Sequence, residues 1–308
     1  GSAWTMSGDL TVASAGVLGG LLTITDEGQV INDNAFLAPI AGRHGEAMVE
    51  SLEGGTSTWI NNGSLNIGGS TTAAGGTAEM WIATGGVVTV ADTLRVWDNG
   101  VLNIADGSIS ASHLFLRGGV NYSGALDFSG AGPINSLTLS GGTLNATTIN
   151  FGVAAMNGFG VINGDVSSTG SITATGDLTL GDSNSFTGSI LSGPLIVGAH
   201  TVTVRKAGFF TIGQFTSISG GRLVAPNGAA LPVGTSIVAH GEIDARIAAQ
   251  SGSTIVASGN LTLGDANSFA GFFSDGELYT EEHQVTLNDA NDAVLGSLTS
   301  IGSSAGAG

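Results

Sequence analysis

The chain has 308 residues, of which 52 are glycine, 5 are proline and none is cysteine, and its formal net charge is −17. Its 7 Lys and Arg residues are too few for nucleic-acid or anionic-membrane binding, and the lack of cysteine excludes disulfides and thiolate metal sites. A hydrophobic content of 42% is too high for a disordered chain, and no apolar stretch is long enough to span a membrane, so we expect no membrane insertion of this region.

The first third of the chain, residues 1–110, contains repeats that carry tryptophan. The stretch SAWTMSGDLTV from Ser2 matches STWINNGSLNI from Ser57 without a gap, and a partial third copy begins at Val96. Fixed spacing of this kind is typical of repeat architectures. We expect each ring to lie partly buried at the start of a strand, where it covers a corner of the coil below, with a row of exposed rings that stack on sugars as the alternative. The residues concerned are Trp4, Trp59, Trp81 and Trp97.

Residues 111–159 are predicted to be connecting coils, and residues 160–308 form a second repeat array. In this array GDLTLGDSNSFTG from Gly176 matches GNLTLGDANSFAG from Gly259, an offset of 83 residues. We therefore expect one continuous solenoid over residues 1–308, made of the segments 1–110, 111–159 and 160–308.

A triplet of an aliphatic residue, Thr or Asn, and a second aliphatic residue recurs along the chain. Alternation with a period of two predicts short strands whose aliphatic residues face inward and whose middle residue faces water. Strands this short bury their apolar face only by stacking, so the sequence predicts an all-β, parallel β-solenoid with coils of about 14 to 23 residues. Examples are Leu10-Thr11-Val12, Leu22-Thr23-Ile24, Leu65-Asn66-Ile67, Val88-Thr89-Val90, Leu102-Asn103-Ile104, Leu178-Thr179-Leu180 and Leu261-Thr262-Leu263.

The segment GDSNSF, residues 181–186, is similar to the loop that carries the nucleophile of serine proteases. However, Asn184 replaces the second glycine of that loop, and the duplicate has Ala266 in place of Ser183. We therefore interpret Asp182 and Asp265 as turn residues that accept hydrogen bonds from backbone N–H groups two positions on.

The acidic segment 274–293 is a candidate for Ca²⁺ binding, but it lacks the order of the known calcium loops, and a solvated edge is the favoured interpretation. Its carboxylates belong to Asp275, Glu277, Glu281, Glu282, Asp289 and Asp292. The histidines are not spaced as local metal pairs, and a turn or cap role is expected for His200 and His283, which are equivalent in the duplication. The others are His44, His113 and His240.

Two further functions remain as alternatives. A polysaccharide lyase or hydrolase would need converging carboxylates and a base, for which Arg205, Lys206, Arg222 and Arg246 are available, but these do not follow acidic residues in both copies. Ice binding would need regular rows of Thr, and here Thr alternates with Asn. The sequence predicts no catalytic, cofactor-binding or metal-binding residue and no cofactor.

The pattern Ser-x-Trp, Gly-x-Leu-x-Val/Ile and the segment GVINGDV from Gly160 resemble repeats in the passenger regions of autotransporter adhesins and related secreted surface proteins of Gram-negative bacteria. The resemblance implies a right-handed parallel β-helix that is located outside the cell, as a passenger fragment or a freestanding secreted solenoid. It also implies a structural or adhesive, non-enzymatic role.

The partners expected from this resemblance are a receptor or glycan on a host or neighbouring cell, with self-association as an open alternative. We expect residues 31–54 and 222–240 to form loops that project from the coils and hold the ligand.

Overall fold

The computed structural model describes residues 1–16, 18–52, 54–128, 134–186, 189–265, 272–288 and 294–295. The chain divides into two compact units, residues 1–150 and 151–308. The described residues form strands and turns without any helix. Accordingly, the described part of the chain offers no helix that could cross a membrane.

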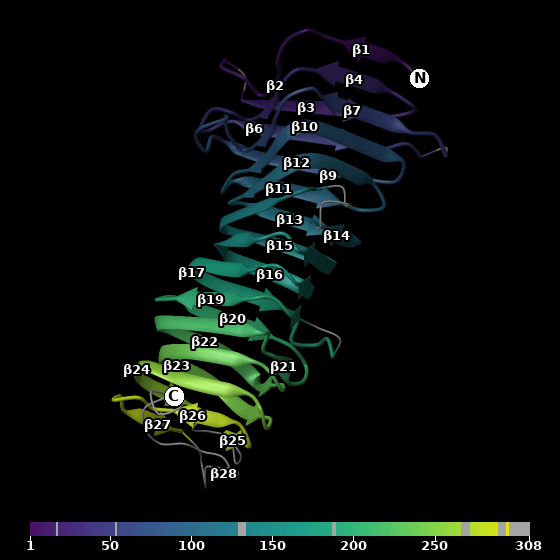
Figure 1. Cartoon of the computed structure of the whole chain (residues 1–308). Coiled ribbons are helices and arrows are strands. Elements are labelled where there is room, and N and C mark those ends of the chain that lie inside the picture. Colours follow the sequence, from purple (N-terminus) through teal and green to yellow (C-terminus); the bar gives the residue numbers. More distant parts are fainter. Residues whose placement is uncertain are drawn as a thin grey trace. The chain divides into compact units, whose positions relative to one another are not determined.

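Short strands follow one another through both units (Figure 1). Unit 1 contains β1 (Ala3–Thr5), β2 (Leu10–Val12), β3 (Gly19–Ile24), β4 (Gln29–Asn32), β5 (Ala35–Leu37), β6 (His44–Val49), β7 (Ser57–Asn61), β8 (Leu65–Ile67), β9 (Thr77–Ile82), β10 (Gly86–Val96), β11 (Gly100–Ile104), β12 (Ser108–Leu116), β13 (Gly119–Tyr122), β14 (Ala125–Asp127) and nearly all of β15 (Leu137–Gly152). Unit 2 contains β16 (Met156–Ser168), β17 (Ile172–Gly181), β18 (Ile190–Leu191), β19 (Leu195–Gly198), β20 (Thr201–Arg205), β21 (Phe210–Thr211), β22 (Phe215–Leu231), β23 (Ser236–Ala249), β24 (Thr254–Leu263), β25 (Phe272–Ser274), β26 (Glu277–Tyr279), β27 (Val285–Leu287) and β28 (Val294–Leu295).

Each strand pairs in parallel with the strand that takes the same place one coil later. In unit 1 three such ladders surround the core. Ladder 1 runs through β1, β4, β7, the start of β10 and the start of β12; ladder 2 runs through β2, β5, β8 and the ends of β10 and β12 into β15; ladder 3 runs through β3, β6, β9, β11 and β13 into β15. The predicted all-β parallel solenoid is confirmed, with about 12 turns.

The aliphatic positions of the triplets form columns inside the coils. In ladder 2 the register places one inward column through successive coils, and its members are almost completely buried. Burial of each such side chain contributes about 1.5–3 kcal/mol. The members of this column are Leu10, Ala35, Leu65, Leu94, Leu114 and Leu137.

Coil length varies along the chain, and the predicted range is wrong for the first coils of unit 1. There 29 residues separate the stacked positions Gln29 and Thr58, and 33 separate His44 and Thr77. The extra residues of the longer coil include a side turn in which Ser70 N–H donates to the Ala73 carbonyl at 2.8 Å. Later coils fall within the range, with 18 residues between Asn103 and Asn121 in unit 1 and 18 between His240 and Ser258 in unit 2.

The expected projecting loops are also not found. Residues 31–54 contain β5 and β6, and residues 222–240 lie largely in β22 and β23. Both segments are therefore part of the coils themselves. The two segments are less repetitive than the rest of the chain, but in the structure they supply inward residues such as Ala47 and Leu223.

The tryptophans divide into two groups. Trp59 and Trp97 are almost completely buried, with 0% and 5% exposure, whereas Trp4 and Trp81 are only partly buried, with 52% and 42% exposure. Trp4 and Trp59 occupy the same inward column, with Val30 between them. Trp59 is covered from both sides by Val30 and Val88, but β1 pairs only with β4, so the Trp4 ring is left open on one side.

A polar cluster lies inside the core beside Trp59. The indole N–H of Trp59 donates to Asn32 Oδ1 at 2.7 Å, and Asn32 Nδ2 donates to Asn61 Oδ1 at 2.9 Å. All three residues are fully buried. Because a buried polar group without a partner is costly, these bonds fix both the ring and the register of neighbouring coils.

The 83-residue duplication in unit 2 preserves a corner contact. Asp177 Oδ1 accepts a hydrogen bond from Thr201 N at 2.8 Å, and in the second copy Asn260 Oδ1 accepts one from Gln284 N at 3.2 Å. The contact therefore ties one coil to the next in both copies. It depends on the side-chain oxygen that Asp and Asn share, and not on charge.

Replacing Asn32 with alanine should destabilise unit 1 by about 2–4 kcal/mol, because it removes the acceptor of the buried Trp59 N–H and the donor to Asn61. Urea unfolding followed by tryptophan fluorescence would measure the change. The matched control is Asn62→Ala, at an exposed position next to the cluster, which should stay within about 0.5 kcal/mol of the wild type. Equal effects of the two substitutions would contradict this account of the cluster.

Candidate functional site

The strongest candidate site is the outward surface of ladder 3 in unit 1, which we call the ladder-3 face. Burial alternates along β6 and β9, so that every second side chain points out of the coil. The outward side chains then line up in rows across the coils because the strands pair in register. One row contains Leu21, Glu46, Glu79 and Val101, and the next contains Thr23, Met48, Trp81, Asn103, Asn121 and Asn145.

An exposed tryptophan stands in the middle of this face. Trp81 lies between Met48 on β6 and Asn103 on β11, and 42% of it is exposed. It takes the middle position of the triplet Met80-Trp81-Ile82, where the flanking residues are both fully buried. This triplet is the sequence signal for an outward ring, because the middle position of the pattern faces away from the core.

A chain of amide hydrogen bonds runs beside the ring from coil to coil. Asn103 Nδ2 donates to Glu79 Oε1 at 2.9 Å, Asn121 Nδ2 donates to Asn103 Oδ1 at 2.8 Å, and Asn145 Nδ2 donates to Asn121 Oδ1 at 2.7 Å. Asn103 is only 9% exposed, so the prediction that the middle residue of each triplet faces water is wrong for this residue. It is wrong also for Asn66, which is fully buried and donates to the Ala35 carbonyl at 3.2 Å.

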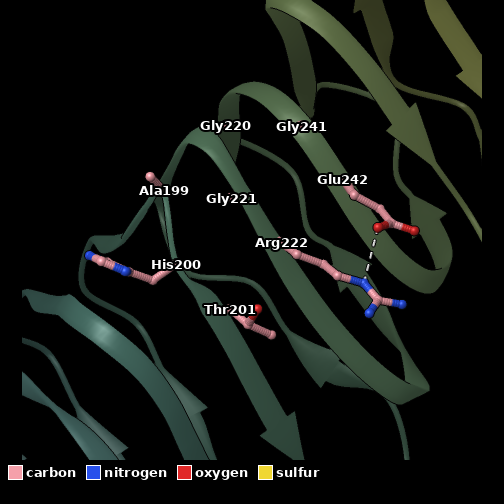
Figure 2. Close-up of a pocket in the computed structure, with 8 residues that line it drawn as sticks. All are labelled: Ala199, His200, Thr201, Gly220, Gly221, Arg222, Gly241 and Glu242. Carbon is pink, nitrogen blue, oxygen red and sulfur yellow. Dashed lines mark ion pairs between the residues drawn. The ribbon is translucent and has the colours of Figure 1, made fainter.

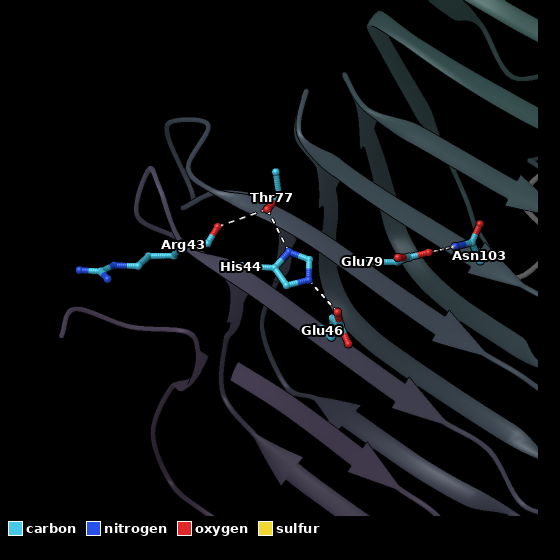
Figure 3. A network of polar contacts seen from close by, with 6 residues as sticks. All are labelled: Arg43, His44, Glu46, Thr77, Glu79 and Asn103. Carbon is cyan, nitrogen blue, oxygen red and sulfur yellow. Dashed lines mark hydrogen bonds and ion pairs between the residues drawn. The ribbon is translucent and has the colours of Figure 1, made fainter. Parts of the chain in front are cut away.

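His44 connects two coils at the edge of the face (Figure 3). Its Nε2 lies 2.6 Å from Glu46 Oε1 and its Nδ1 lies 3.0 Å from Thr77 Oγ1. The order of hydroxyl, imidazole and carboxylate resembles a hydrolase triad. However, the Thr77 hydroxyl donates to the Arg43 carbonyl at 3.4 Å, and because a hydroxyl has one proton it does not donate to His44 at the same time. We therefore interpret the group as a contact between two coils.

Glu46 and Glu79 are register partners on neighbouring strands. Their Cα atoms are therefore about 4.8 Å apart, and both side chains point outward. The Arg43 side chain extends away from both carboxylates (Figure 3). The face consequently combines one exposed aromatic ring, two adjacent carboxylates and a line of amides.

A second candidate is an open cavity of about 320 Å³ in unit 2 (Figure 2). It is lined by Ala199, His200, Thr201, Gly220, Gly221, Arg222, Gly241 and Glu242. Gly241 has a φ of +114°, and a Cβ at this position would collide with the carbonyl oxygen of Gly221. The bare backbone at this corner therefore results from the close stacking of coils.

Arg222 occupies the cavity wall and joins two coils. Its Nε lies 3.0 Å from Glu242 Oε2, and its Nη2 donates to Asp244 Oδ2. Sequence reasoning did not find this group, because Arg222 and Glu242 become neighbours only through the coil register. The side chains are partly exposed, so the pairs contribute at most about 1 kcal/mol. We interpret the group as a contact between coils.

The sequence candidates for catalysis and metal binding are placed as follows. Asp182 Oδ1 accepts from Asn184 N at 2.8 Å, which confirms its role in the turn, and Ser183 is exposed in that turn. Asp265 belongs to the described residues, but the rest of its turn does not. In the acidic segment, Glu277 accepts a hydrogen bond from the Tyr279 hydroxyl at 2.9 Å, and Asp289 and Asp292 lie outside the described residues.

Each histidine makes its own local contacts. His200 N and His283 N donate to backbone carbonyls three residues earlier, at 3.4 and 2.9 Å, which confirms their turn role. His240 Nδ1 lies 3.3 Å from Ser258 Oγ. Among the residues that the structure describes, no group of three or more His, Asp or Glu side chains is placed to hold a metal ion.

Searches against models of protein families, curated protein sequences and solved structures returned no match to the chain.

His113 should make stability depend on pH. Burial and the neighbouring Arg95 guanidinium lower its pKa from 6.5, and Asp92 opposes them. Because the unfolded chain then takes up the proton more readily, the stabilisation is complete above pH 6.5 and is lost as the pH falls from there through the lower folded-state pKa. The ring bonds to Ser136 Oγ at 2.7 Å.

The expected result is that unfolding free energy falls between pH 7 and pH 5, and that His113→Gln reduces this fall. Urea unfolding at several pH values would measure it, with His240→Gln as the control at a more exposed histidine. An unchanged pH profile in His113→Gln would show that other groups cause the dependence.

Proposed function

We propose that the chain is a non-catalytic, adhesive β-solenoid, displayed at or released from the surface of a Gram-negative bacterium, that binds glycans through the ladder-3 face. The observation that carries the proposal is the exposed ring of Trp81, held in register beside a line of carboxylate and amide groups. Aromatic rings stack on the apolar faces of sugars, and carboxylates and amides hydrogen-bond sugar hydroxyls.

The stiffness of the face supports this function. Met48, Trp81 and Asn103 are outward residues of three adjacent strands, and their neighbours in sequence are buried in the core. A preorganised surface loses little conformational entropy when it binds an extended ligand. The extracellular location and the adhesive role are supported by the resemblance of the Trp repeats to autotransporter passenger regions.

Cleavage of a polysaccharide is the second candidate, and the adjacent carboxylates of Glu46 and Glu79 are the observation that favours it. Three features weigh against it. Both carboxylates point to the same side of the sheet, Glu46 is paired with His44, and Glu79 is bonded to the Asn103 amide.

Replacing Trp81 with alanine should weaken glycan binding about tenfold or more, because the stacking surface is lost. Binding of the whole chain to an array of immobilised glycans would identify the ligands, and titration with the best of them would measure the change. The matched control is Trp4→Ala, since Trp4 is an exposed ring on ladder 1 and lies outside the ladder-3 face. Equal affinity of wild type and Trp81→Ala for every glycan bound would refute this site.

The same glycans separate binding from cleavage. Incubation with the protein should leave the content of reducing ends and of unsaturated sugars unchanged. Release of either product, together with its loss in Glu46→Gln, would establish the enzymatic alternative instead.

A further inference from the structure

We infer that the ladder-3 face selects glycans that carry a free amine: the carboxylates of Glu46 and Glu79 bind the ammonium group of an amino sugar while Trp81 stacks on the sugar. The inference rests on the proposed function, because it names the ligand class of the same face. The inference adds the charge of the ligand, because stacking on Trp81 does not by itself distinguish charged sugars from neutral ones.

The two carboxylates form an unusual pair for neighbouring strands. Like charges directly opposite one another on adjacent strands destabilise a sheet. Glu46 and Glu79 nevertheless stand in register, and their row continues to Leu21 and Val101, which carry no charge. A cation bound between the carboxylates would remove the repulsion, so the pair is suited to a positively charged ligand.

The groups around the pair compensate it only in part. His44 contacts Glu46 from one side, and Asn103, which is neutral, contacts Glu79 from the other. The guanidinium of Arg43 points away from both (Figure 3). An excess of negative charge therefore remains on the part of the face that is open to solvent.

The geometry fits an ammonium group better than a metal ion. Calcium requires six to eight oxygen ligands, and in the part of the chain that the structure describes Glu46, Glu79 and the neighbouring His44 do not form a group that could hold a metal ion. An ammonium group has three N–H donors, for which two carboxylates and one solvent molecule are sufficient. It also gains from an aromatic ring close by.

Trp81 lies beside the two carboxylates, so the site can bind a sugar ring as well as a cation. Glu79 and Trp81 are two residues apart on β9 and point to the same side, so their Cα atoms are about 7 Å apart. A ring that stacks on Trp81 can therefore direct a substituent towards the carboxylates. Acidic glycans, by contrast, would be repelled by the same pair.

The test compares two ligands that differ only in charge. Calorimetric titration of the whole chain at pH 6 would use a glucosamine oligomer, whose amines are protonated, and its fully N-acetylated counterpart of the same length. We expect at least tenfold tighter binding of the free amine, and we expect this preference to shrink as salt is raised.

The double variant Glu46→Gln, Glu79→Gln should abolish the preference, so that the two oligomers bind with equal affinity. Glu27→Gln is the matched control, because it removes one exposed carboxylate that lies outside the rows of the face, and it should retain the preference. Circular dichroism would verify that each variant keeps its strand content.

The possible results separate the two proposals. Equal affinity for both oligomers, sensitive to Trp81→Ala, would overturn the amine preference and leave the glycan-binding function standing. A preference that persists in the double variant would also overturn the inference. If neither oligomer binds and Trp81→Ala affects no glycan, both proposals fail.

Discussion

The in-register stacking of short parallel strands is the constraint on which the rest of the structure depends. A strand of three residues, such as β2 or β8, buries too little surface to be stable alone. Leu65 is fully buried because Ala35 and Leu94 take the same place in the coils before and after it. The same register that aligns these inward residues also aligns the outward ones, so every surface row is a consequence of core packing.

The interior could be predicted from the sequence because it obeys a local rule. The aliphatic residues of a triplet such as Val88-Thr89-Val90 alternate with a period of two, and that period alone determines which of them point inward. Stacking then follows, since no other element is available to cover them. The turn role of Asp182 was likewise local, because its partner Asn184 is two residues away.

The surface could not be predicted in the same way, because it depends on the length of every coil. Glu46 and Glu79 meet because their coils differ from those predicted, with 33 residues between the stacked positions His44 and Thr77. Arg222 meets Glu242 through a much shorter coil in unit 2. A change of one residue in a turn would move an entire outward row to new neighbours, and sequence spacing does not reveal where such turns gain or lose residues.

The buried asparagines are a second reason why the prediction was incomplete. In the triplet pattern Asn and Thr are interchangeable, and both were assigned to the surface. Asn66 and Asn103 are buried instead, and outside the triplets Asn32 joins Trp59 within the core. The amide has its donor and its acceptor on two separate atoms, so Asn103 donates from Nδ2 to one neighbouring coil and accepts at Oδ1 from the other, whereas a Thr hydroxyl has both functions on a single, closer oxygen.

The internal duplications show which features the architecture requires and which are additional. Trp4 and Trp59 share a column, and the corner contact of Asp177 recurs at Asn260, so these are parts of the repeating framework. Trp81 aligns with Thr23 in its row, and a Thr there is sufficient for the fold. Coil stacking therefore does not explain the large exposed ring of Trp81. An exposed residue that the fold does not require is free to serve in ligand binding. This distinction, between residues that every coil needs and residues that only one coil carries, is the physical basis for placing the function on the ladder-3 face.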